Sequence, residues 1–197
     1  KGVKVPPKFA KVLRIGKENT QSVFDDLYPL LLTREMYDLA YNKVKSNPGM
    51  MTPGNSEETL SGWGPEVISR IISKLSDESF QFSRSRMVEI PKPSGGKREL
   101  KIATPKDKIV QRIIADILEA IYEPSFSKQS FGFRPKLGCH DALESIKKRY
   151  KSTRWFIEGD ITNCFDEIDH STLIGIIGRR IKDKRFIRLL YKALRAG

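Results

Sequence analysis

The residues with the clearest chemical pattern lie between Arg154 and His170, in the stretch RWFIEGDITNCFDEIDH. A short apolar run, Trp155 to Ile157, is followed closely by the acid Asp160. This pattern predicts a buried β-strand over residues 155–160 that places a carboxylate at the edge of a sheet. Carboxylates in such a position bind Mg²⁺, which is usually completed by water and substrate phosphates. An acid that caps a turn after the strand explains the spacing equally well.

A second group of chemically suited residues lies in a predicted antiparallel β-hairpin over residues 86–103. Residues 87–90 and 99–102 alternate apolar and polar side chains around a Gly-containing loop. Between positions 84 and 108 there are three acids and eight bases: Arg84, Arg86, Lys92, Lys97, Arg98, Lys101, Lys106 and Lys108. Such a density of cations suits a triphosphate or a nucleic-acid backbone. The alternative is that Lys and Pro protect an exposed sheet edge from aggregation.

Composition narrows the class of partner. The chain has 197 residues, 39% of them hydrophobic, enough to bury the core of one large domain or two small ones. Its net charge of +12 and its pI near 9.7 predict a polyanionic partner. Nucleic acid is favoured over a membrane, because no apolar run approaches the length of a membrane span. The cysteines, Cys139 and Cys164, lack metal-ligand spacing and indicate free thiols in a reducing compartment.

Helices are predicted around the hairpin and the strand, so the expected fold class is mixed α/β. Residues 1–22 are basic and lack apolar periodicity, which indicates an extended arm or linker. A helical pattern begins at Val23, Thr33 suits the cap of a second helix that runs to about Lys45, and Pro65 suits the first turn of a third. Apolar spacing predicts further helices over residues 105–122, 141–150, 173–181 and 186–194.

The stretch DITNCFDEIDH resembles the first catalytic motif of reverse transcriptases, and with the preceding IEG it is similar to those encoded by group II introns. Three further stretches resemble the same family in the same order: TPGNSEETLSG, IPKPSGGKR and SFGFRP. The resemblance covers the chain from about Met36 to Gly197. It implies a right-hand polymerase with a helical N-terminal extension at residues 23–78, fingers at 79–153 and an incomplete palm at 154–197.

The resemblance also implies roles for individual residues. Asp160, with the backbone carbonyl of Ile161, is implied as a ligand of a catalytic Mg²⁺, and Phe165 as a screen against the sugar 2′ position. Lys92 and Arg98 are implied to contact the phosphates of the incoming nucleotide. Contacts to template or RNA are expected from Arg84, Arg86, Lys97, Lys101 and Arg134. Arg134 pairing with an acid is the alternative, and Phe133 beside it is expected in the core.

A member of this family is expected to bind group II intron RNA or another structured RNA and to assist splicing as a maturase. It is also expected to copy RNA into DNA, using nucleotide triphosphates on a primer-template. The family's Asp-Asp hairpin and thumb come after the stretch that ends at Gly197. We therefore expect this chain alone to be inactive and the remaining palm and thumb to complete it. The alternative is a non-catalytic RNA-binding module. The motifs look more mitochondrial than bacterial, which favours a mitochondrion over a bacterial cytoplasm.

Overall fold

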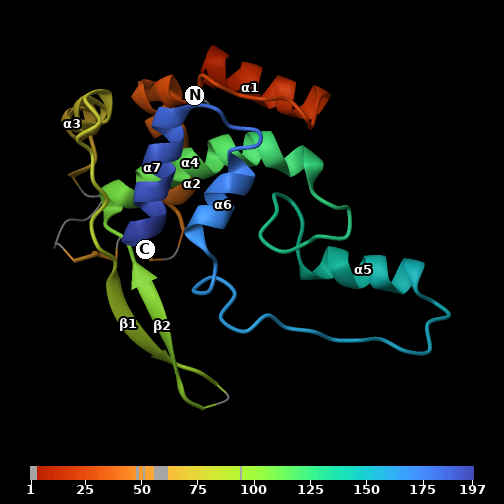
Figure 1. Ribbon diagram of the computed structural model, residues 1–197. Helices are drawn as coiled ribbons and strands as arrows, with labels where there is room; N and C mark the ends of the chain where they lie inside the picture. The colour runs from red at the N-terminus through yellow and green to blue at the C-terminus, as the bar shows by residue number, and fades with distance from the viewer. Residues whose placement is uncertain (1–3, 48, 51, 56–61, 94) are drawn as a thin grey trace.

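The long helix α4 (Pro105–Tyr122) is the central element of the structure (Figure 1). The structure is a computed structural model and describes residues 4–47, 49–50, 52–55, 62–93 and 95–197. Pro105 lies in the first turn of α4, and the Thr104 hydroxyl oxygen accepts a hydrogen bond from the backbone N–H of Asp107. The predicted helix over residues 105–122 is therefore confirmed. Its buried apolar side chains form the centre of the core: Ile109, Val110, Ile113, Ile114, Ile117 and Ile121.

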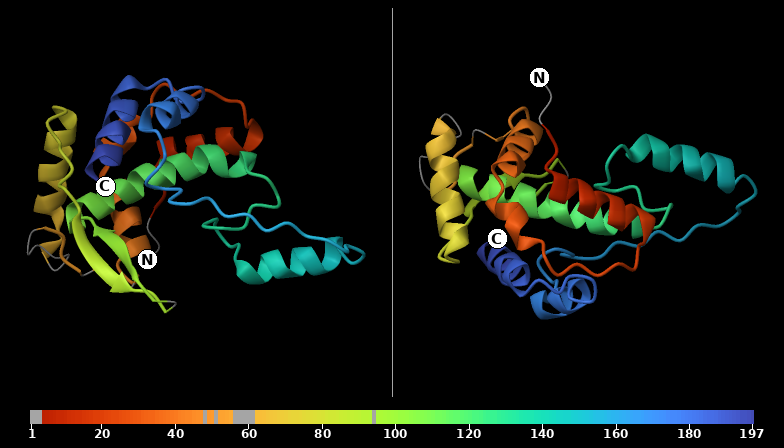
Figure 2. Two further views of the ribbon diagram at one scale, coloured as in Figure 1. Left: turned by 60° about the horizontal axis from the view of Figure 1, so that its bottom comes forward. Right: turned by 90° about the horizontal axis from the view of Figure 1, so that it is seen from above.

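The helix α1 (Pro7–Glu18) packs along α4, in the region where the sequence predicted an extended arm (Figure 2). That prediction is wrong for these residues, because Phe9, Val12 and Gly16 recur at helical spacing and are buried. Gly16 permits a close approach of the two helices. A Cβ added to it would lie 2.3 Å from the backbone oxygen of Ala120 in α4, so any larger residue would push the backbones apart.

Three elements between α1 and the hairpin complete this side of the core. The helix α2 (Arg34–Val44) packs against α4, and the 3-10 helix η1 (Tyr28–Leu32) contacts α3 (Pro65–Ser76). Pro65 begins α3 as predicted, and Thr33 takes the N-cap position of α2 as predicted. The Thr33 hydroxyl does not cap the helix, because it donates to the backbone oxygen of Pro29 at 2.9 Å. The helical pattern predicted from Val23 yields only η1, because Phe24 forms a parallel bridge with Ile181. Positions 48, 51 and 56–61 of the TPGNSEETLSG region lie outside the described residues.

The helices α6 (His170–Ile177) and α7 (Lys184–Ala196) complete the core from the C-terminal side. Both begin before the predicted positions, because the side chains of Asp169 and Asp183 accept hydrogen bonds from backbone N–H groups of the first turn.

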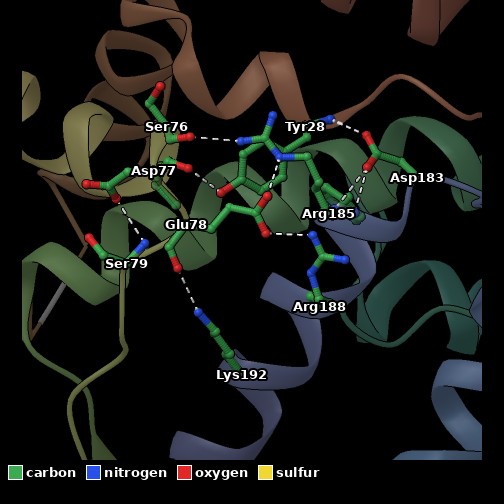
Figure 3. A network of polar contacts seen from close by, with 11 residues as sticks. Tyr28, Ser76, Asp77, Glu78, Ser79, Asp183, Arg185, Arg188 and Lys192 are labelled. Carbon is green, nitrogen blue, oxygen red and sulfur yellow. Dashed lines mark hydrogen bonds and ion pairs between the residues drawn. The ribbon is translucent and has the colours of Figure 1, made fainter.

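Figure 3 shows the polar network that joins α7 to the turn after α3. Arg188 donates to the Glu78 carboxylate at 2.6 Å, and this hydrogen bond lowers the pKa of the Glu78 carboxyl.

Two parts of the chain extend from this helical body (Figures 1 and 2). One is the hairpin of β1 (Arg86–Pro91) and β2 (Lys97–Ile102), which confirms the predicted hairpin and, with the helices, the mixed α/β class. The other, residues 126–168, follows η3 (Glu123–Ser125) and is called the excursion below. It contains α5 (Cys139–Arg149), which has no buried residue. No helix in the described part of the chain has both the length and the hydrophobicity that a membrane span requires.

Candidate nucleotide and nucleic-acid interface

The hairpin presents its cations on two different faces. In the antiparallel register, Arg98 lies opposite Ile90, and Lys101 lies opposite Met87. Side chains alternate between the faces of a strand, and directly opposed residues share a face. Arg98 and Lys101, which are three positions apart in β2, therefore lie on opposite faces of the hairpin.

The two residues implied to contact nucleotide phosphates, Lys92 and Arg98, are both exposed, and neither forms an ion pair within the described part of the chain. Their charges are thus available to an anion. The neighbouring cations differ. Lys97 is paired with Glu89 across the hairpin, while Arg86 is half-buried at the start of β1. Arg84 is exposed just before the hairpin. Lys92 and Arg98 are therefore the tip cations least engaged by the protein itself.

The apolar run expected to form a buried palm strand at residues 155–160 forms no strand in the structure. Trp155, Phe156 and Ile157 are 88%, 86% and 100% exposed. A strand requires a neighbouring strand with which its backbone can form hydrogen bonds. Among the described residues β1 and β2 pair only with each other, so nothing lies alongside this run. The predicted strand is wrong here because it lacks a pairing partner in the described part of the chain.

Asp160, Ile161 and Phe165, the residues implied to contact metal and sugar, all lie exposed in the excursion. Within the described ranges there is no group of three or more acids, histidines or cysteines that is arranged to hold a metal ion. Mg²⁺ requires near-octahedral oxygen ligands, with carboxylates supplemented by water and phosphate oxygens. The Asp160 carboxylate and the Ile161 carbonyl therefore do not make a Mg²⁺ site by themselves.

One ion pair joins the hairpin to the turn that carries Phe165. The Lys101 amine lies 3.2 Å from the Asp166 carboxylate. The turn itself is tight, because the backbone N–H groups of Asp166 and Glu167 both donate to the Asn163 oxygen at 3.0 Å. Lys101, expected to contact RNA, thus contacts an acid of the DITNCFDEIDH stretch. The structure brings this turn to the Lys101 face of the hairpin and leaves Arg98 on the other face.

The side chain of Arg134, expected to contact the template, is turned into its own loop. It is 12% exposed and forms an ion pair with Glu123 at 2.8 Å. Its Nη1 atom also donates to the backbone oxygens of Ser127 and Ser130, at 2.7 and 2.8 Å. The alternative prediction, in which Arg134 pairs with an acid, is therefore the one that the structure confirms. The expectation that Phe133 lies in the core is wrong: its side chain is fully exposed, because Arg134 occupies the interior of the loop.

Sequence reasoning missed two cationic features. The first is the outer face of α1, which carries Lys8, Lys11, Arg14 and Lys17. The sequence pattern that could have predicted this helix is the helical spacing of Phe9, Val12 and Gly16 after a proline. The second is the Lys101 contact with Asp166. These residues are 65 positions apart, and no periodicity in the sequence connects them.

Comparisons with known proteins place these features in a family. A family model described as reverse transcriptase (RNA-dependent DNA polymerase) matches residues 90–196, more than half of the chain. A group II intron-encoded protein, LtrA of Lactococcus lactis, is 44% identical over 195 residues, which are 97% of this chain and 33% of that protein. An uncharacterized 91 kDa protein in a cob intron of Schizosaccharomyces pombe is 53% identical over 167 residues, 85% of this chain and 21% of that protein.

A more distant relative is the mitochondrial nuclear intron maturase 2 of Arabidopsis thaliana, 30% identical over 175 residues, 81% of this chain and 23% of that protein. The chain therefore spans about a fifth to a third of the length of these curated relatives. The matched residues include the hairpin loop and β2, the Arg134 loop and the stretch that carries Asp160.

Proposed function

Because this chain belongs to the reverse transcriptase (RNA-dependent DNA polymerase) family, we propose that it forms the fingers and the first part of the palm of a group II intron reverse transcriptase and maturase. In this function it binds intron RNA and assists splicing, and within a longer protein it copies RNA into DNA. The observation that carries the proposal is the family match over residues 90–196, which includes Lys92 and Arg98 of the hairpin as well as Asp160. A relative described as an intron maturase supports the splicing role.

We assign the parts as follows. Residues 23–78 are a helical N-terminal extension, residues 79–153 the fingers and residues 154–197 the start of the palm. Lys92 and Arg98 bind the phosphates of the incoming nucleotide, which their exposure and lack of ion pairs within the described part of the chain support. Arg84, Arg86 and Lys97 contact the RNA backbone.

Polymerases of this family generally use divalent metal ions, which stabilise the attacking and leaving oxygens of phosphoryl transfer. We propose that Asp160 and the Ile161 carbonyl supply part of a Mg²⁺ site. The other carboxylates would come from the rest of a longer protein. We therefore assign no catalytic step to this chain alone. Phe165, whose backbone lies in the tight turn that begins at Asn163, is proposed to limit the space at the sugar 2′ position.

The test is a chimera in which this chain replaces the 195 aligned residues of the Lactococcus lactis protein. Primer extension on an RNA template with Mg²⁺ is measured against the parent protein. We expect the chimera to extend primers and this chain alone to bind RNA without extending them. Asp160→Asn keeps the size of the side chain and removes its charge, so it should abolish extension by the chimera. Glu158→Gln, two positions away, is the matched control and should retain it.

Two results would contradict the proposal. Wild-type extension by the Asp160→Asn chimera would show that the metal assignment is wrong. A chimera that binds RNA tightly but never extends primers, while the parent protein does, would favour the alternative of a non-catalytic RNA-binding module.

A mitochondrial location is proposed because the motifs of this chain look more mitochondrial than bacterial. The Arabidopsis relative is named as mitochondrial, whereas the Lactococcus relative is bacterial, so the relatives alone are compatible with either compartment. Fractionation of source cells and detection of the protein with an antibody would decide between them. Recovery with the bacterial cytoplasm would contradict the proposal.

A further inference from the structure

The loop between η3 and α5 presents two aromatic side chains to solvent, Phe126, which is half exposed, and Phe133. Arg134 holds this loop closed from inside through the Glu123 carboxylate and the backbone oxygens of Ser127 and Ser130. Its guanidinium also lies over the Phe126 ring, 5.6 Å from the ring centroid. Phe133, next to Arg134, is fully exposed. A closed loop with a free aromatic side chain differs from a flexible loop that happens to contain one.

The backbone at Phe133 is in a costly conformation. Its φ is 56°, in the left-handed region that bulky residues rarely adopt, and Lys136 has a φ of 61°. Such conformations are unfavourable for bulky residues and persist only where the surrounding structure imposes them. Phe133 directly precedes Arg134, whose side chain is held inside the loop, and the ring of Phe133 is directed away from the protein.

The surroundings of Phe133 are cationic. Between Ser125 and His140 the sequence contains Lys128, Arg134 and Lys136 and no acid, and both lysines are exposed. The other exposed aromatic run, Trp155 and Phe156, differs in having charges of both signs nearby, with Arg154 before it and the acids Glu158 and Asp160 after it. An aromatic side chain between cations matches an unpaired nucleotide, because the base stacks on the ring while the phosphates contact the amines.

We propose that the Arg134-closed loop is a binding site for single-stranded RNA, with Phe133 stacking on an unpaired base and Lys128 and Lys136 contacting its phosphates. The charge of the loop selects this occupant over an apolar protein surface. The inference rests on the proposed function, since it requires an RNA-binding protein, and it names one site and the form of RNA bound there. Arg134 acts as a positioning residue, because its side chain holds the loop and does not reach the RNA.

The test compares two fluorescently labelled RNAs by anisotropy, an oligoadenylate of about 12 nucleotides and a blunt duplex of similar length. Phe133→Ala should weaken binding of the single strand about 5-fold or more, since stacking on an aromatic side chain contributes about 1–3 kcal/mol per base. Duplex binding should not change, because paired bases are not available to stack. Phe133→Trp should restore single-strand affinity, and its added indole fluorescence should be quenched by the oligoadenylate.

The matched control is Trp155→Ala, which removes an exposed aromatic side chain outside the Arg134-closed loop, in a stretch that carries both Arg154 and the acids Glu158 and Asp160. It should leave single-strand binding unchanged. The inference is overturned if Phe133→Ala binds the single strand as wild type does, if it weakens duplex binding to the same degree, or if Trp155→Ala causes an equal loss. If the wild-type chain binds neither RNA, the proposed function fails as well, so the two failures are distinguishable.

Discussion

The Asp183 carboxylate accepts a hydrogen bond from the backbone N–H of Tyr28 at 2.7 Å, across a sequence separation of 155 residues. The same oxygen accepts from the N–H of Leu27 at 2.8 Å. The other carboxylate oxygen accepts from the N–H groups of Arg185 and Phe186, at 3.0 and 3.1 Å. One buried acid therefore binds the first residues of η1 and caps α7 at the same time.

Asp183→Ala should lower the free energy of unfolding by about 2–4 kcal/mol, because several backbone donors lose their acceptor in the protein interior. Asp183→Asn keeps one acceptor oxygen and should lose less. Urea denaturation followed by circular dichroism measures both variants. A loss below about 0.5 kcal/mol in the alanine variant would be the value of an ordinary surface substitution and would contradict this account.

Gly16→Ala should destabilise the docking of α1 on α4 by about 1–3 kcal/mol, since the added Cβ would meet the Ala120 backbone oxygen at 2.3 Å. Thermal unfolding and proteolytic release of residues near α1 are the measurements. The control is Gly175→Ala in α6, where no atom lies within 4 Å of the new Cβ. That variant should be more stable than wild type by about 0.5–1 kcal/mol. Equal effects in the two variants would rule out close helix packing as the cause.

The ion pair between Lys101 and Asp166 should hold the turn that carries Phe165 against the hairpin. Because both side chains are substantially exposed, we expect a coupling of only about 0.2–1 kcal/mol, and less at high salt. A double-mutant cycle with Lys101→Ala and Asp166→Ala measures it, with amide exchange of residues 163–167 as the readout. The reversed pair, Lys101→Asp with Asp166→Lys, should restore protection that either single reversal loses. No recovery in the reversed pair would exclude an electrostatic tether.

Burial raises the pKa of the Asp107 carboxyl above its ordinary value, although the hydrogen bonds from Thr104 and Ser83 act in the opposite direction. The folded state therefore binds this proton more readily than the unfolded state does. Stability from this group is fully present below the unfolded pKa of about 3.9 and is lost as pH rises through the raised folded pKa. Relative to Asp107→Asn, wild type should thus gain stability as pH is lowered from 7 toward about 4. Thermal melts of both proteins across this range would show it, and a constant difference would contradict it.

RNA binding by this chain should weaken steeply with salt, because each phosphate contact on a duplex lowers log K by about 0.9 per tenfold increase in salt.

In the chimera, the double variant Lys92→Ala with Arg98→Ala should raise the KM for nucleotides. Lys97→Ala is the control for the nucleotide KM, since Lys97 is paired with Glu89 and is assigned to the RNA backbone and not to the nucleotide. A double variant with the KM of the unaltered chimera would remove the role assigned to Lys92 and Arg98.

Local patterns in the sequence were sufficient for most of the regular elements. The helix over residues 105–122 and the hairpin over residues 86–103 each have their own period, cap or turn residues, so nothing distant was needed to predict them. Thr33 and Pro65 marked helix starts for the same reason. The helix α1 was missed because Lys8, Lys11, Arg14 and Lys17 interrupt its apolar residues at every third position.

The arrangement of the candidate site depended on contacts that local patterns do not contain. Residue types identified Lys101 and Arg134 as cations suited to RNA, but the acids that they meet, Asp166 and Glu123, are 65 and 11 positions away. The strand predicted over residues 155–160 required a neighbouring strand, and strand pairing is a property of the assembled sheet. The roles proposed for Asp160 and Phe165 rest on the family resemblance alone.

The bond between Asp183 and η1 also determines when this core can form during synthesis. The backbone N–H groups of Leu27 and Tyr28 are buried in the finished structure, but their acceptor, the Asp183 carboxylate, follows more than 150 residues later. At synthesis rates of about 5–20 residues per second, these two donors lack this acceptor for several seconds or longer before residue 183 emerges. During that interval the packing of η1 relies on α2, α3 and α4, which are synthesised earlier. Translation speed between residues 31 and 183 should therefore influence the yield of folded protein.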